Sequence, residues 1–233
     1  PPKPPRRQRQ MCIRDRYNPG GSINSALILA SLITGQFEND IFNTEEWNTE
    51  IQNYWINNNP EYLVNRFLSL ESSLNLNRVF ILTTRSSASA SELIINCLDP
   101  YIDVIQIGTT TYGKYQASVT LYDSENFSNQ NINPSHNYAI QPLVLKTLNV
   151  LGITDYFNGI NPEYDFEEKV YNMGIIGDLN EPMLNFAMGL INSRAEINIQ
   201  PETLEFVDDN FKFDFLKREM YIENKEIKIN DGN

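Results

Sequence analysis

The sequence predicts an α/β fold built around a parallel βαβ unit. Residues 78–83 (RVFILT) and 104–108 (VIQIG) are short apolar runs with the composition of buried strands. Between them, a turn of small residues at 86–91 leads into an apolar helical segment that ends at Asp99-Pro100. Strand, helix and strand in this order favour two parallel neighbours joined by a crossover helix.

The segments before this unit predict one helix and one less regular stretch. After a Pro-Gly-Gly turn, apolar residues recur at helical spacing from Ala26 to Ile33, and Gly35 is a suitable helix end. Residues 36–77 are rich in Asn, Glu and aromatic side chains, so we expect an irregular or partly helical excursion there. Its aromatic residues are expected to pack rather than to bind a ligand.

The segments after the unit predict strands, a loop, a helix and a hairpin. Residues 117–122 and 139–150 read as strands, whereas 156–169 contains Pro and Asn, as a loop does. Asn180 can cap a helix that carries Pro182 in its first turn and an apolar face beyond it. The last forty or so residues alternate acidic positions with aromatic or aliphatic ones and predict a terminal hairpin.

Composition indicates one globular domain and disfavours nucleic acid as a partner. Of the 233 residues, 41% are hydrophobic and 21% are charged, a balance that supports one sizeable core. No run approaches the roughly 18 apolar residues that a membrane span needs. The formal net charge of −12 would repel the phosphates of a nucleic acid.

Residues 1–16 differ in composition from the rest of the chain. They hold six Lys or Arg residues and one Asp, which leaves 12 basic against 29 acidic residues, a net charge of −17, in the remainder. They lack the apolar core of a signal peptide, and the stretch MCIRDR resembles translated sequencing-adapter sequence. We therefore expect a non-native or solvated tail outside the fold, which the intact mass of the natural protein would test.

The sequence offers few residues for metal or cofactor chemistry. The two cysteines, Cys12 and Cys97, suggest neither a disulfide framework nor a metal site, and Cys97 is expected to be a buried thiol. The single histidine, His136, lies in a polar loop and is expected to be solvated. Because the sequence has no histidine cluster and no phosphate-binding GKS/T loop, no metal and no cofactor is predicted.

The serine-rich turn at 86–92 (SSASASE) is the main candidate for chemistry. A hydroxyl at a strand-to-helix turn projects from a sharp bend, and the helix start supplies unpaired N–H groups and the positive end of a dipole. This geometry favours an attacking oxygen and an oxyanion together. Taken alone, however, a serine-rich turn more often only caps a helix.

Three motifs in order carry a family resemblance: NPGG at 18–21, SASASE at 87–92 and TYGK at 111–114. Together they resemble the C-terminal processing, or tail-specific, peptidases and their tricorn-like relatives. The later segments QPLVLKTLNVLGITDYFNGINPE and IGDLNEPMLNFAM resemble the bacterial lipoprotein branch of that family, so the resemblance spans about residues 17–191. It implies a crotonase-like (ClpP-like) peptidase core whose amino-terminal part is missing from this chain.

The resemblance also implies the roles of single residues. Ser89 corresponds to the nucleophile and Lys114, 25 residues later, to the general base. The oxyanion would be bound by the backbone N–H of Ala90 and of Gly20 or Gly21, since glycine lets the backbone approach a substrate closely. A lysine accepts the serine proton only when its amine is neutral, a state that burial favours.

The group that orients Lys114 stays open. Many members of the family have a glutamine four residues after the lysine, where this chain has Ser118. Gln116 is nearby. Its side chain would point to the opposite face of the strand if Ala117 shares the face of Lys114, and this depends on the strand register. Some members also have an acid eleven residues after the nucleophile. This chain has a proline there, and the adjacent Asp99 is expected to end a helix.

The function that the resemblance implies is a serine endopeptidase acting on protein tails or peptides in the cell envelope, periplasmic or anchored to the outer membrane. A signal sequence, a lipid anchor, a PDZ-like domain and the first catalytic strands are expected upstream. Residues 17–195 would be a partial catalytic domain and 196–233 a carboxy-terminal extension. The alternative is a catalytically inactive peptide-binding scaffold of the same fold. The Ser/Lys pair disfavours a crotonase-type acyl transferase or hydratase.

Overall fold

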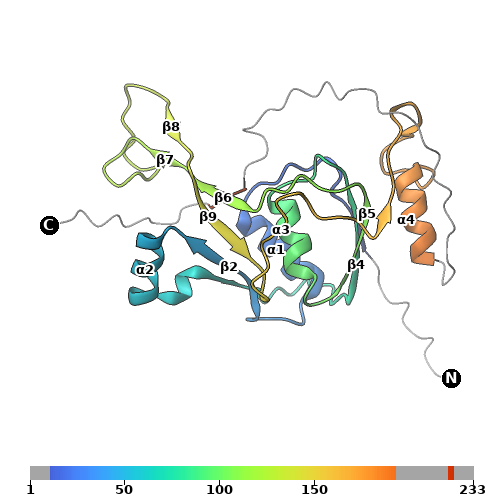
Figure 1. Cartoon of the computed structure of the whole chain (residues 1–233), viewed down its shortest axis with the longest axis horizontal. Helices are drawn as coiled ribbons and strands as arrows, with labels where there is room; N and C mark the ends of the chain where they lie inside the picture. The colour runs from blue at the N-terminus through green and yellow to red at the C-terminus, as the bar shows by residue number, and fades with distance from the viewer. Residues whose placement is uncertain (1–10, 193–219, 223–233) are drawn as a thin grey trace.

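The computed structural model of the chain describes residues 11–192 and 220–222, which form two main sheets, a small hairpin and four α-helices (Figure 1). The helices are α1 Ile23–Thr34, α2 Thr49–Asn58, α3 Ala90–Leu98 and α4 Pro182–Asn192, with 3₁₀ turns η1 Pro60–Leu63 and η2 Val170–Asn172. The first sheet contains β1 Met11–Arg14, β4 Arg78–Thr83, β5 Asp103–Gly108 and β10 Tyr164–Asp165. The second contains β2 Ile41–Trp47, β3 Val64–Arg66, β6 Gln116–Val119, β9 Leu143–Leu148 and β11 Met220–Ile222, and the hairpin joins β7 Leu121–Tyr122 to β8 Ala139–Ile140.

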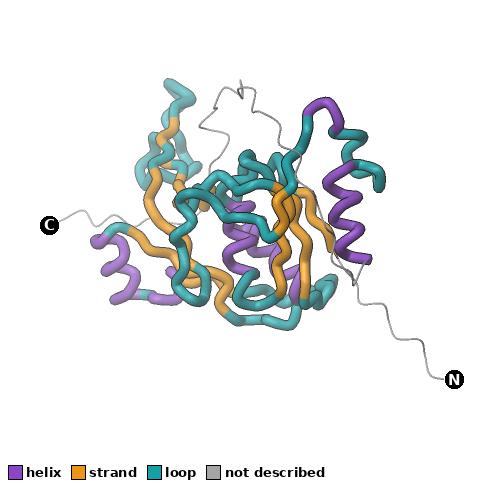
Figure 2. The backbone as a smooth tube through the Cα atoms, turned by 45° about the vertical axis from the view of Figure 1, so that its right-hand side comes forward, coloured by secondary structure: helices purple, strands orange, loops and turns teal. Residues whose placement is uncertain are grey.

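The first sheet is parallel throughout, in the order β1-β4-β5-β10. The helix α3 connects the neighbours β4 and β5, so the predicted βαβ unit and the α/β class are confirmed. Along β4, Val79 and Ile81 join the core that contains α1 and α3, whereas Phe80 and Leu82 join a second cluster on α4. Figure 2 shows α4 on one side of these strands and the helices α1 and α3 on the opposite side. Burial of both faces explains why the strands are almost continuously apolar.

The helix α1 forms where its apolar spacing predicts it. Its buried residues recur every three or four positions from Ile23 to Ile33, which turns one stripe of the helix toward the core. Gly35 ends the helix in the left-handed conformation, with φ 71°, and its N–H donates to the Ser31 carbonyl at 3.1 Å. At its other end the helix begins at Ile23, after the N-cap residue Ser22. The Pro-Gly-Gly turn therefore lies at the amino-terminal end of α1.

The region expected to be irregular, residues 36–77, supplies two strands of the second sheet, whose order is β11-β6-β9-β2-β3. The strand β2 reads IFNTEEW, and its polar residues hide it from an alternation pattern. Glu45 is buried there because its carboxylate accepts hydrogen bonds from Trp47 Nε1 at 2.9 Å and from Asn65 Nδ2 at 3.0 Å. The strand therefore depends on side-chain partners that only the folded chain brings together.

The amino-terminal segment differs from the expectation of a tail outside the fold. Residues Met11–Arg14 form β1 and pair in parallel with β4, and both Asp15 and Arg16 are buried. The Arg16 guanidinium lies 2.5 Å from a Glu168 oxygen and 2.6 Å from a Glu181 oxygen. These partners stand 152 and 165 residues away in the sequence, so composition could not reveal them. Residues 11–16 therefore lie within the fold rather than in a tail outside it. Whether residues 1–16 are non-native stays a prediction, and 1–10 lie outside the described residues.

The carboxy-terminal half follows the prediction with three changes. The expected strand 117–122 is divided into β6 and β7, which belong to different sheets. The expected strand 139–150 is divided into β8 and β9 at Gln141-Pro142, since proline has no N–H to donate to a sheet. The expected loop 156–169 contains the short strand β10, and the predicted helix beginning at Pro182 is confirmed as α4.

Most of the predicted extension at 196–233 lies outside the described residues, and the hairpin expected there stays a prediction. Its described part is β11, which pairs in parallel with β6.

Candidate active site

Ser89 stands at the start of α3 in a strained and buried position. Its backbone has φ 64° and ψ −118°, and such a conformation costs a non-glycine residue about 1–3 kcal/mol. Its exposed fraction is 0%, and among the described residues its Oγ makes no hydrogen bond of ordinary geometry, although it faces the Glu92 N–H as in a capping box. A buried hydroxyl without a partner is unfavourable by about a further 1–3 kcal/mol. Strain and an unbonded polar atom together mark Ser89 as a candidate for function.

Unlike Ser89, the neighbouring Ser87 and Ser91 form side-chain hydrogen bonds. Ser87 Oγ donates to the Asp15 carbonyl at 2.7 Å, and Ser91 Oγ donates to the Asp15 carboxylate at 2.9 Å. The N–H of the intervening Ala88 donates to the Asn18 carbonyl at 3.1 Å. The chain that leaves β1 therefore holds the serine turn in place by bonds on either side of Ser89.

The NPGG loop packs closely against Ser89. Gly20 has φ 112° and Gly21 has φ 145°, conformations that glycine adopts without strain. A Cβ on Gly20 would lie 2.6 Å from the Ser89 Cβ and 2.9 Å from the Ala90 nitrogen, so a larger residue does not fit. The Gly20 N–H donates to Asn18 Oδ1 at 3.1 Å. The structure thus brings Gly20 and Ala90 beside Ser89, with Gly21 next along the chain.

The lysine turn meets the serine turn through Glu92. One carboxylate oxygen, Oε2, accepts the N–H of Ser89 and the N–H of Lys114, each at 2.8 Å. The other, Oε1, accepts the Gly113 N–H at 2.6 Å and the Thr111 hydroxyl at 2.5 Å. The two residues predicted for catalysis therefore share one buried carboxylate. The role of Glu92 was not predicted from the sequence, although Ser-x-x-Glu before an apolar helix is the signature of a capping box.

The strand register around the two orienting candidates is irregular. Lys114 precedes β6, and the pairing of β6 with β9 shifts between Ala117 and Ser118, so simple alternation does not hold there. Ser118 is buried, and its hydroxyl donates to the Met220 carbonyl and accepts from Gln141 Nε2, both at 3.1 Å. Gln116 is half-buried and lies opposite a residue of β9. The residue that orients Lys114 stays a prediction.

Asp15 is an acid buried against the serine turn. Burial raises the pKa of Asp15 from its usual 3.8 to about 7, while the hydrogen bonds from Ser91 and Asn18 lower it and the charge of Glu92 raises it further. The folded chain therefore holds a proton on Asp15 at a pH where the unfolded chain has lost it.

This raised pKa gives a testable pH dependence of stability. The contribution of Asp15 is fully present below about pH 4 and is lost as pH rises through about 7, a loss of about 2–4 kcal/mol. In Asp15→Asn the group cannot ionise, so its free energy of unfolding should fall less than that of the parent between these pH values in urea titrations. Asp99→Asn, at the exposed end of α3, should keep the parental pH profile. Parallel profiles for the parent and Asp15→Asn would contradict the assignment.

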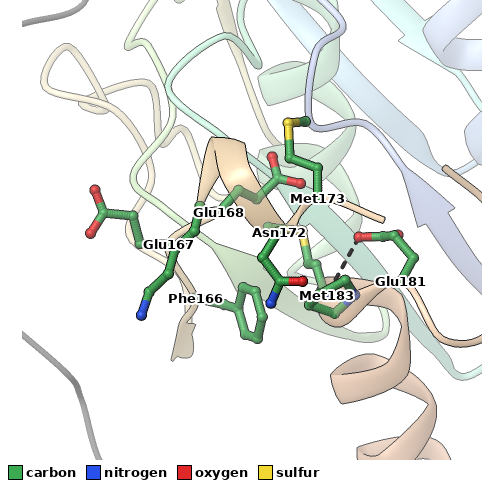
Figure 3. A pocket seen from close by; sticks show the side chains of 9 residues that line it. Phe166, Glu167, Glu168, Asn172, Met173, Glu181 and Met183 are labelled. Carbon is green, nitrogen blue, oxygen red and sulfur yellow. Dashed lines mark hydrogen bonds between the residues drawn. The ribbon is translucent and has the colours of Figure 1, made fainter. Parts of the chain in front are cut away.

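A cavity of about 160 Å³ lies beside α4 (Figure 3). Its wall includes Phe166, Met183 and the carboxylates of Glu168 and Glu181. Arg16 engages both of these carboxylates, so its single positive charge offsets part of their negative charge. None of the residues predicted for catalysis lines this cavity.

The remaining reactive side chains lie apart from the serine turn. His136 Nε2 is 3.0 Å from Asp123 Oδ2, in the loop between β7 and β8 that extends away from the core in Figure 1. Cys97 is buried as predicted, and burial raises the pKa of its thiol. Within 11–192 and 220–222, no three His, Cys, Asp or Glu side chains are grouped to hold a metal ion. None of the helices in the described part of the chain has the length and apolar character of a membrane span.

Comparison with known proteins places the chain in a family. Residues 13–133 match the sequence model of peptidase family S41, and no curated protein matches the chain. Among solved structures, an S41 protease candidate from Bacteroides fragilis is similar with a TM-score of 0.64 and 25% identity, over 80% of this chain and 46% of that one. A peptidase candidate from Parabacteroides merdae gives 0.49 and 17%, over 82% and 54%. The photosystem II D1 C-terminal processing protease gives 0.45 and 14%, over 68% and 34%.

The family match covers more than half of the chain and includes all three motifs that carry the resemblance. The chain spans less than half the length of the Bacteroides fragilis structure, at 46%. Its α/β fold with a parallel sheet agrees with that relative. The predicted relationship is confirmed, and the chain belongs to peptidase family S41.

Proposed function

We propose that this protein is a serine peptidase in which Ser89 attacks a peptide carbonyl and Lys114 accepts the proton of Ser89. Membership of family S41 supports peptidase activity and a protein substrate. The observation that carries the choice of Ser89 is its hydroxyl, which is buried at a strained turn and makes no hydrogen bond of ordinary geometry among the described residues. Such a hydroxyl can turn toward a substrate and a base without breaking an existing bond.

The proposed reaction has two halves. Ser89 Oγ forms a bond to the carbonyl carbon as its proton moves to the Lys114 amine, and a tetrahedral oxyanion results. The C–N bond then breaks, and the Lys114 ammonium returns the proton to the leaving amine. Water then attacks the acyl carbon and gives a proton to the Lys114 amine. The bond between the acyl carbon and Ser89 Oγ breaks, Lys114 returns that proton to Ser89 Oγ, and the acid product loses its remaining proton to solvent.

The oxyanion needs N–H donors that are already in place. The Ala90 N–H belongs to the first turn of α3, where N–H groups have no partner within the helix and the helix dipole is positive. Because the Gly20 N–H is engaged by Asn18, we assign the second donor to Gly21. Gly20 then serves as the spacer that lets the loop approach Ala90.

The substrate class and location rest on the family resemblance. We propose protein tails or peptides as substrates, and the cell envelope, in the periplasm or at the outer membrane, as the location. A lipid anchor would belong to sequence outside this chain. Fractionation of cells that express the complete natural protein tests the location.

A second candidate is an inactive peptide-binding member of the family. It is favoured by Ser118, which stands where many members carry glutamine and whose hydroxyl is engaged by Met220 and Gln141.

Covalent labelling separates the two candidates. We expect a fluorophosphonate to form an adduct on Ser89 of the complete natural protein, because the reagent bonds to a serine oxygen whose proton a neighbouring base accepts. Mass spectrometry of the peptide that contains residues 86–98 locates the adduct. Ser89→Ala should remove it, and Ser91→Ala should retain it. An adduct on another serine would sink the assignment of Ser89, and no adduct on any serine would favour the inactive scaffold.

A further inference from the structure

A single buried carboxylate ties together the two turns on which the proposed function rests. Glu92 has an exposed fraction of 0% and bonds the backbone N–H groups of both Ser89 and Lys114 at 2.8 Å. Ser89 belongs to the step between β4 and α3, whereas Lys114 belongs to the step between β5 and β6. In the described part of the chain no sheet ladder pairs these two steps, so their relative position depends on contacts such as these.

The hydrogen bonds of Glu92 fit an ionised carboxylate. Each oxygen accepts two bonds, and all four donors come from Ser89, Thr111, Gly113 and Lys114. A protonated carboxyl would turn an O–H toward donors and lose part of the set. The pKa of Glu92 is raised overall, because the effect of burial exceeds that of the four hydrogen bonds, which lower it. The charge of Glu92 in turn raises the pKa of Asp15 and of Tyr156.

The same carboxylate restrains the backbone of Ser89. The φ angle of 64° directs the Ser89 N–H into the fold, where Glu92 Oε2 accepts it. Without this acceptor the N–H would be buried and unsatisfied, and the strained conformation would lose one of the contacts that hold it. The direction of the Ser89 side chain, and hence the position of Oγ, follows from that backbone conformation.

The lysine turn has its own set of contacts to Glu92. The Thr111 hydroxyl donates to Glu92 Oε1 and accepts the N–H of Ile160 at 2.7 Å, which links the turn to the loop before β10. Gly113 has φ 98°, and a Cβ there would lie 2.3 Å from the Phe157 carbonyl, so the turn is closely packed on that side as well. Glu92 thus meets a turn whose conformation is fixed by its neighbours.

We propose that Glu92 is a positioning residue that holds the Ser89 turn and the Lys114 turn in register for proton transfer. It touches neither the substrate nor the proton that moves. Its effect on the reaction is geometric. One carboxylate bonds the backbones of both Ser89 and Lys114, so the Cα positions that carry the two side chains are fixed relative to each other.

The proposal is tested with Glu92→Gln in the complete natural protein. Glutamine has the same shape, but its NH₂ group would face two of the four donors, so one pair of bonds is lost. We expect kcat and the second-order rate of fluorophosphonate reaction at Ser89 to fall about 100-fold while KM changes little, because a displacement of about 1 Å has this cost. Glu45→Gln is the matched control, since it removes another buried carboxylate that accepts side-chain N–H groups, in the second sheet. It should lower Tm without changing the rate of labelling.

Thr111 supplies a milder pair of variants in case Glu92→Gln does not fold. Thr111→Val removes one donor and should slow labelling, whereas Thr111→Ser keeps the hydroxyl and should restore most of the rate. Parental labelling rates in both folded Glu92→Gln and Thr111→Val would overturn the positioning role and leave the proposed function intact. Failure of the parent to label at Ser89 would instead overturn the proposed function itself.

Discussion

Replacing Lys114 with methionine is expected to lower kcat by about 10⁴-fold or more while the protein stays folded. Methionine keeps the length and apolar stem of lysine but has no amine to accept the Ser89 proton. A serine hydroxyl without a base is a poor nucleophile, so acylation should become the slow step. The measurement is kcat with a peptide substrate in the complete natural protein, together with circular dichroism and urea unfolding.

Lys146→Met is the control for removing a lysine. Lys146 lies on β9, where its Nζ contacts Glu46 Oε1 at 2.8 Å and its side chain is 40% exposed. Such an exposed ion pair contributes little to stability, so this variant should keep both activity and fold. Turnover by Lys114→Met within about tenfold of the parent would assign the base to another group.

Replacing Gly20 with alanine is expected to damage both catalysis and stability. The new Cβ would lie 2.6 Å from the Ser89 Cβ and 2.9 Å from both the Ala88 oxygen and the Ala90 nitrogen. The NPGG loop must then move away from Ala90, which separates the two proposed oxyanion donors. Loss of one such donor lowers kcat by about 10²–10³-fold, and alanine at φ 112° adds about 1–3 kcal/mol of backbone strain.

Gly152→Ala separates the clash from the backbone strain. Gly152 has φ 76°, but a Cβ there meets no atom within 4 Å, so only the strain remains. This variant should unfold at lower urea concentration than the parent and keep its kcat. If Gly20→Ala loses no more activity than Gly152→Ala, close approach of the loop to Ser89 is not needed for the reaction.

Local pattern was sufficient for the elements around the serine turn. The apolar runs at 78–83 and 104–108 and the helix between them need only their own residues to be recognised, because burial on both faces requires continuous apolar sequence. The strand β2 was not recognised, because Glu45 is stabilised there by Trp47 and by Asn65, a residue of another strand.

The amino-terminal segment shows the limit of composition. Its basic residues suggested a tail, yet Arg16 is buried against Glu168 and Glu181, and the backbone of Met11–Arg14 pairs with β4. Backbone pairing needs no particular side chains, so a short strand at an edge of the sheet leaves little trace in the sequence.

The sequence by itself determined the family, the α/β class and the order of the three motifs, because these depend on residue types at fixed spacing along the chain. The family resemblance already pointed to Ser89 through its spacing to Lys114. The tertiary structure adds a difference between the serines, because Asp15 bonds Ser87 and Ser91 but not the Ser89 hydroxyl. The meeting of the serine and lysine turns on Glu92 is likewise tertiary. Hydrogen bonds between segments 25 residues apart exist only after the chain has folded.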